Sequence, residues 1–176
     1  MRAGIQEGFD TIERQRTEIE AAVSALSDAQ REWRTAEGEW SARDVLEHLV
    51  LSDEAVGRVR ALEAMEIVPP PVRLLPPAVR RRMILGALRR NVRLPLPSPG
   101  IAPGSGESLA VLLERWATVR DAMREELARS RKGDAPYSHP ILGALTAEGM
   151  LELDEAHLGY HARQIATIRR SPGFPA

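Results

Sequence analysis

Four long amphipathic segments limit the fold of this chain more than any other feature. In each one, apolar residues recur at alternating steps of three and four, which places them on one face of an α-helix. No stretch shows a convincing strand pattern. We therefore predict an all-α fold, a four-helix bundle that forms one domain over residues 1–176. The segments cover approximately residues 4–26, 42–65, 108–132 and 147–168.

The start of the second segment carries a clear helix signal. Ser41 is a good N-cap, and Asp44 three residues later completes a pattern like a capping box. The preceding stretch, residues 27–38, is interpreted as an irregular connection between the first two helices. Two tryptophans, Trp33 and Trp40, are expected to seal that connection onto the core.

A Pro- and Arg-rich segment, residues 67–106, separates the second helix from the third. It holds most of the prolines and seven arginines but no acidic residue. We interpret it as a long crossover that begins where Pro69–Pro71 end the second helix. Within it, Val79–Arg90 can form a short helix between extended arms. One side of that helix is predicted to carry Val79, Met83, Ala87 and Leu88.

The role of this crossover stays open. It could be a solvated charged segment or an oligomer contact, or it could capture an anionic substrate. Nucleic-acid binding is disfavoured because the pI is about 6.4 and no aromatic residues interleave the arginines. Attachment to a membrane surface is disfavoured because the helix is short and bounded by prolines.

Three histidines on predicted inner helix faces carry the clearest chemical signal. His157 and His161 are four residues apart, so both imidazoles lie on one face of the last helix. His48 lies on the inner face of the second helix. Three neutral imidazoles can hold a divalent metal ion and leave one position open, although hydrogen-bonded structural histidines are the alternative. Leu158 stands where metalloproteases of the HExxH type have Glu, which disfavours that chemistry.

Polar residues near these histidines could support the site. Asp44 and Asp154 lie one turn before His48 and His157, where they could orient an imidazole. Helix capping or surface roles explain them equally well. His139, next to Pro140 in a predicted turn-rich loop, could be a further ligand or a substrate-side group. We favour a structural hydrogen-bonding role for it.

Four separated motifs in this order resemble the DinB-like superfamily, including its thiol S-transferases. The resemblance spans nearly the whole chain. The motifs are Trp40-Ser41 followed by His48; His139-Pro140-x-x-Gly143-x-Leu145-Thr146; His157-x3-His161; and Gln164-Ile165. The chain departs from many relatives at Ala144, where they have Pro, and at Tyr160, where they have a basic residue.

The resemblance implies an up-down-down-up bundle, often dimeric, with a divalent ion held by His48, His157, His161 and water. The ion could be Zn, Ni, Fe or Mn. Tyr160 and Gln164, like Asp44, His139 and Asp154, are candidates for supporting the ligands or for facing the substrate. Some relatives join a low-molecular-weight thiol, such as bacillithiol, mycothiol or glutathione, to an electrophile.

These observations lead to one leading functional hypothesis and two alternatives. We expect a metal-dependent thiol S-transferase for detoxification or stress, because a metal could hold the thiol as thiolate in a chain without cysteine. A metal-dependent hydrolase and a non-enzymatic metal-binding or stress-response protein are the alternatives. The expected partners are a small-molecule substrate and a second copy of the chain, with no nucleic acid and no membrane. No signal-peptide-like or membrane-spanning apolar run is present, so we expect a cytoplasmic protein.

Overall fold

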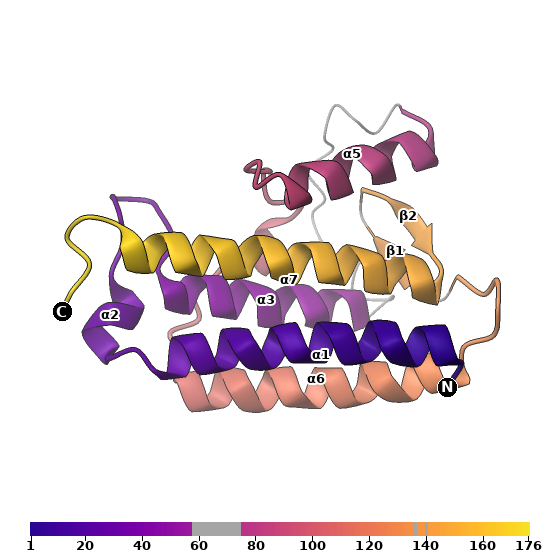
Figure 1. Ribbon diagram of the computed structural model, residues 1–176, viewed down its shortest axis with the longest axis horizontal. Helices are drawn as coiled ribbons and strands as arrows, with labels where there is room; N and C mark the ends of the chain where they lie inside the picture. Colours follow the sequence, from indigo (N-terminus) through magenta and orange to yellow (C-terminus); the bar gives the residue numbers. More distant parts are fainter. Residues whose placement is uncertain (58–74, 136, 140) are drawn as a thin grey trace.

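Long helices pack side by side as a bundle, and a shorter helix lies outside it (Figure 1). The computed structural model describes residues 1–57, 75–135, 137–139 and 141–176. In chain order, the elements are α1 (Ala3–Ser24), α2 (Asp28–Glu32), α3 (Ala42–Gly57), α5 (Pro77–Arg89), the 3₁₀ helix η2 (Pro99–Ile101), α6 (Leu109–Arg129), β1 (Tyr137–His139), β2 (Gly143–Leu145) and α7 (Ala147–Arg170). The predicted helical fold class is confirmed.

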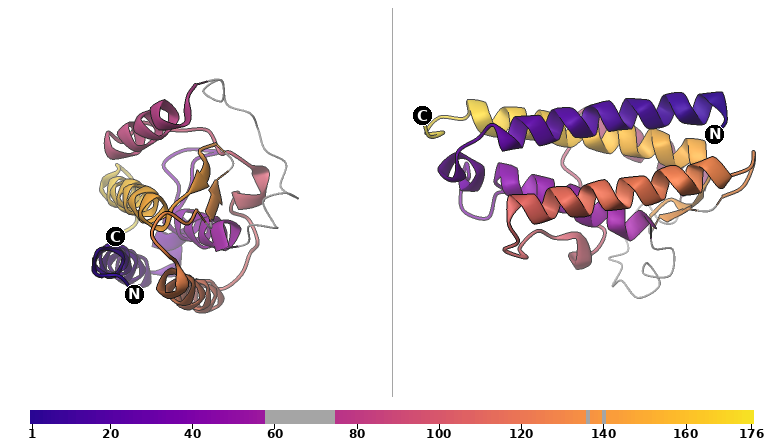
Figure 2. Two further views of the ribbon diagram at one scale, coloured as in Figure 1. Left: turned by 90° about the vertical axis from the view of Figure 1, so that its right-hand side faces the viewer. Right: turned by 90° about the horizontal axis from the view of Figure 1, so that it is seen from below.

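The bundle consists of α1, α3, α6 and α7. In Figure 1, α1 and α7 run from right to left, and α3 and α6 run in the opposite direction. The end view in Figure 2 shows these four helices packed together and α5 lying against the outer side of α7. None of the helices in the described part of the chain is both long and apolar enough to cross a membrane.

The helix α3 is the most enclosed element of the bundle. Every residue from 44 to 50 is buried, so its polar side chains need partners inside the protein. Glu47 is fully buried and accepts hydrogen bonds from the backbone N–H groups of Gly104 (3.1 Å) and Ser105 (2.7 Å). Burial alone would raise the pKa of Glu47, but these bonds lower it below its ordinary value.

Side-chain caps start three of the bundle helices, α3, α6 and α7. The Ser41 N–H donates to Asp44 Oδ2 (2.7 Å), and the Asp44 N–H donates to Ser41 Oγ (3.1 Å). This reciprocal pair is the predicted capping box of α3. Ser108 caps α6 and Thr146 caps α7 in a similar way. The predicted inner faces of α1, α6 and α7 are also largely buried.

Two short elements differ from the prediction of irregular structure. The connection between α1 and α3 contains α2, which starts with a capping box between Ser27 and Gln30. The region predicted as a turn-rich loop forms an antiparallel hairpin, in which Tyr137 pairs with Leu145 and His139 with Gly143. Both elements are too short to show a periodic pattern, so the loop prediction was wrong there.

The helix predicted in the crossover is confirmed as α5, but the residues predicted to share one side differ in burial, since Leu88 is buried and Val79 and Met83 are exposed. Val79 and Met83 are 43% and 49% exposed, while the residues that pack toward α7 are Ile84, Leu85 and Leu88. Arg81 and Arg89 both pair with Glu152 of α7, so ion pairs accompany the apolar contact between the two helices. The predicted end of the second helix near Met65, and the role of Pro69–Pro71 in ending it, lie outside the described residues.

Candidate metal centre

His48 projects from the buried helix α3, and a hydrogen bond determines which of its ring nitrogens carries the lone pair. The side chain is only 4% exposed. Its Nδ1–H donates to the carbonyl oxygen of Ile101 in η2 at 2.8 Å, so the lone pair of the ring lies on Nε2. The Pro- and Arg-rich crossover therefore supplies the group that orients this imidazole, a contribution that no sequence pattern indicated.

The other two histidines come from α7. The Nδ1–H of His161 donates to Gln164 Oε1 at 2.8 Å, which again leaves the lone pair on Nε2. His161 is buried and His157 is half-buried. The four-residue spacing places both rings on the bundle side of the helix, as predicted.

The three Nε2 atoms converge on one point. His157 Nε2 lies 3.3 Å from His48 Nε2 and 3.0 Å from His161 Nε2, and all three ligand atoms lie within 4.8 Å of one another. Ligand nitrogens on a tetrahedral zinc ion would be about 3.3 Å apart, since each Zn–N bond is about 2.0–2.1 Å. The residues present therefore fit a small divalent cation held by three nitrogens.

Electrostatics favour neutral imidazoles at this point. Burial lowers the pKa of His48, and it lowers the pKa of His161 to about 3. The pKa of His157 is lowered well below its ordinary value by burial first and then by the neighbouring His161 and His48. Neutral rings offer lone pairs instead of repelling a cation. Such a donor set suits Zn, Ni, Cu or Fe.

Aromatic rings form the wall beside the imidazoles. The Trp40 ring lies 4.8 Å from His48 and stacks on His161 at 6.3 Å with an interplanar angle of 21°. The Tyr160 ring packs edge-on against His161 at 4.8 Å. Sequence reasoning assigned Trp40 to sealing a loop and missed its place at the site, because its contact with His48 depends on how the chain enters α3. Ser52 Oγ is the nearby hydroxyl, 3.5 Å from His48 Nε2.

Asp44 and Asp154 have other partners than the metal-site imidazoles. Asp44 belongs to the capping box of α3 and pairs with Arg34. The Nδ1–H of His48, for which Asp44 was a candidate acceptor, donates to the Ile101 carbonyl oxygen instead. Asp154 pairs with the buried Arg120. Among the described residues, neither carboxylate accepts a hydrogen bond from His48 or His157.

His139 shapes the hairpin. Its Nδ1 accepts hydrogen bonds from the backbone N–H groups of Ile141 (3.1 Å) and Leu142 (3.2 Å). Burial lowers its pKa to about 4, which keeps Nδ1 free to accept these bonds. This geometry agrees with the structural role favoured from the sequence.

Sequence similarity over most of its length assigns the chain to a protein family. The sequence profile of the DinB superfamily matches residues 11–165. The chain belongs to the DinB superfamily. The matched region contains all four bundle helices in whole or large part and all three converging histidines, so the resemblance seen in the motifs is confirmed. No curated protein and no solved structure shows a significant match to the chain.

Proposed function

We propose that this DinB-superfamily protein is a metal-dependent thiol S-transferase, which joins a low-molecular-weight thiol to an electrophilic small molecule. The observation that carries the proposal is the convergence of three neutral imidazole nitrogens in a chain that has no cysteine. Without a protein thiol, the sulfur nucleophile must come from a co-substrate.

His48, His157 and His161 would hold the metal ion, which Zn, Ni, Fe or Mn could provide. A divalent ion in such a site supplies a Lewis acid that lowers the pKa of a thiol, so that the reactive thiolate is present at neutral pH. Ile101 and Gln164 hold two of the rings in the tautomer that donates from Nε2.

The chain's other residues would bind the electrophile and limit the access of water. Trp40 and Tyr160 form an apolar wall next to the imidazoles, suited to an electrophile with an apolar body. In the reaction, the sulfur forms a bond to the electrophilic carbon, and the bond from that carbon to the leaving group breaks. The thiol proton passes to solvent.

The test uses the purified protein loaded in turn with Zn²⁺, Ni²⁺, Fe²⁺ or Mn²⁺. Monochlorobimane is the electrophile, and bacillithiol, mycothiol and glutathione are offered separately. We expect fluorescent conjugate to form faster than with a His48→Ala control for at least one thiol, with chloride released. The same rate in the control for every metal and thiol would reject the transferase proposal.

Further measurements on the same protein separate the two alternatives. Turnover of an ester substrate without added thiol would favour metal-dependent hydrolysis. A protein that contains no stoichiometric metal and gains no thermal stability from added ions would favour a non-enzymatic role, since a ligand specific for the native state must stabilise it. We also infer that the protein is cytoplasmic and that it forms a homodimer. Sedimentation of the purified protein tests the dimer, which would have twice the 19.4 kDa mass of the chain.

A further inference from the structure

Arg120 of α6 is a buried arginine at which all four bundle helices meet. Its side chain is 2% exposed. Nη1 lies 2.5 Å from Asp154 Oδ2 of α7, and Nη2 lies 2.8 Å from Asp53 Oδ2 of α3. Its Nε is 3.8 Å from Glu13 Oε1 of α1. The sequence gives no sign of this residue's role, because an arginine on a mostly apolar helix face reads as an exposed side chain.

The cluster of Asp53, Arg120 and Asp154, called here the buried triad, is held firmly. The indole N–H of Trp116, a fully buried residue, donates to Asp53 Oδ2 at 2.5 Å. Burial alone would lower the pKa of Arg120, but Asp154 and Asp53 raise it, so the guanidinium keeps its charge. Breaking such a pair leaves an uncompensated buried charge, which makes the paired arrangement strongly preferred over displaced ones.

The buried triad lies next to the histidine cluster along the bundle. Asp53 follows His48 by five residues on α3, about 7.5 Å along the axis, and Asp154 precedes His157 by three residues on α7, about 4.5 Å. Because α3 and α7 run in opposite directions, both aspartates lie on the same side of their histidines. Arg120 is also among the positive charges that lower the pKa of His157, after burial and the other histidines.

Two polar links therefore connect α3 with α7 at neighbouring levels. One is the contact between His48 Nε2 and His157 Nε2, and the other passes from Asp53 through Arg120 to Asp154. Apolar ridge-and-groove packing alone is compatible with a range of helix arrangements, since crossing angles scatter by about 15–20° around the preferred values. The ion pairs from Arg120 to Asp53 and Asp154 restrict how α3 and α7 can be placed, and metal ligands must be positioned to within about 0.5 Å.

We propose that Arg120 is a positioning residue for the metal centre, which sets the register of α3 against α7 by bridging Asp53 and Asp154, and thereby the separation of His48 from His157. The inference rests on the metal-binding step of the proposed function and not on the transferase chemistry. A residue that only stabilises the bundle would affect unfolding without changing the coordination geometry.

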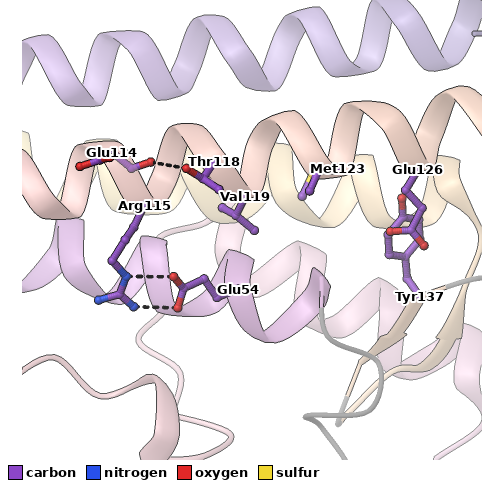
Figure 3. A pocket seen from close by; sticks show the side chains of 9 residues that line it. Glu54, Glu114, Arg115, Thr118, Val119, Met123, Glu126 and Tyr137 are labelled. Atoms are coloured by element: carbon purple, nitrogen blue, oxygen red, sulfur yellow. Dashed lines mark hydrogen bonds and ion pairs between the residues drawn. The ribbon is translucent and has the colours of Figure 1, made fainter.

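Arg115 offers a matched control on the same helix. It also bridges to α3, through two bonds to Glu54 at 2.9 and 2.7 Å, and it pairs with Glu107. Figure 3 shows Arg115 and Glu54 lining a surface pocket together with Thr118 and Val119. Arg115 is more exposed than Arg120 and makes no ion pair with α7. Its loss should weaken the α3 and α6 contact without moving the histidines.

The experiment compares Arg120→Met, Arg115→Met and the wild-type protein, with Co²⁺ as the metal probe. The absorption spectrum of bound Co²⁺ reports coordination geometry, a titration gives its affinity, and thermal unfolding of the metal-free protein reports stability. We expect Arg120→Met to weaken Co²⁺ binding by about tenfold or more and to change the spectrum. Arg115→Met should lower stability and leave the affinity and spectrum unchanged.

Two milder variants keep the test decisive if Arg120→Met does not fold. Arg120→Lys keeps the charge but lacks the planar fork that reaches two carboxylates, and Asp154→Asn keeps the shape and one acceptor. Both should shift the affinity and spectrum in the same direction by smaller amounts. If every folded variant showed wild-type affinity and spectrum, the inference about Arg120 would be overturned, and the metal step of the proposed function would stand. A wild-type protein that binds no Co²⁺ would overturn both the inference and the metal step of the proposed function.

Discussion

His48 and His161 each donate their Nδ1 proton to a fixed acceptor, and this decides which nitrogen faces the centre of the site. The acceptors differ in kind, since Ile101 offers a backbone carbonyl and Gln164 a side-chain amide. Only the second can be removed by substitution. Gln164 is therefore the residue at which the importance of ring orientation can be measured.

Replacing Gln164 with Leu should weaken metal binding by about tenfold, because the His161 ring loses the partner that fixes its tautomer and rotation. The metal-free protein should unfold at nearly the wild-type temperature, since Gln164 is only half-buried. Zinc affinity measured by competition with a chromophoric chelator checks this. Gln164→Glu keeps an acceptor and should bind zinc at least as well as the wild type; equal affinity in the Leu variant would argue against the assignment.

At the scale of single elements, α3 depends on its first turn because it carries both a site histidine and the buried residues around it. The capping box between Ser41 and Asp44 satisfies N–H groups that no solvent can reach. Ser41→Ala should lower the free energy of unfolding by about 1 kcal/mol, measured by urea denaturation. Ser27→Ala in the exposed capping box of α2 is the control and should cost less; an effect of the same size in both would show that burial is not the cause.

The element scale also shows where sequence reasoning succeeds and fails. The faces of α1, α6 and α7 were predictable because one apolar stripe dominates each helix. In α5, Val79 and Met83 form one apolar row while Ile84, Leu85 and Leu88 form another. The row that packs is the one that meets α7, where Glu152 also pairs with Arg89 and Arg81, 63 and 71 residues away in the sequence. Periodicity carries no information about such a partner.

The candidate site was predictable to a similar extent. Spacing on helix faces was enough to bring His48, His157 and His161 together as candidates. The ring-orienting carbonyl of Ile101, the Trp40 wall and the buried Arg120 were not predictable, because each depends on a tertiary contact between distant segments. Backbone acceptors in particular leave no trace in the identity of a residue.

At the scale of the whole molecule, stability should depend on pH through the histidines. Burial lowers the folded-state pKa of His139 to about 4 and of His161 to about 3, against an ordinary value of 6.5. Below pH 6.5, the unfolded chain therefore binds more protons than the folded protein, and stability falls as the pH drops toward 4. Asp53, Glu20 and Glu126 act in the opposite sense, since burial raises the pKa of each, to about 7 for Asp53, but the pKa values of all four histidines are lowered.

Urea unfolding of the metal-free protein should accordingly give a lower free energy at about pH 5 than at about pH 7. His139→Asn keeps an acceptor for the hairpin N–H groups and removes one titrating ring, so it should lose less stability over this range than the wild type. A free energy that is constant or rises on acidification would contradict the expected neutral state of the histidines.

The contact between His48 and His157 joins residues 109 positions apart, and the bond from His48 to Ile101 closes a loop of 53. We expect these distant segments to be ordered late in folding, because loop closure costs entropy before the contact forms. The complete set of ligands is therefore present only when the bundle is nearly assembled. We therefore expect an ion bound there to slow the opening of the folded protein more than it changes the rate of folding.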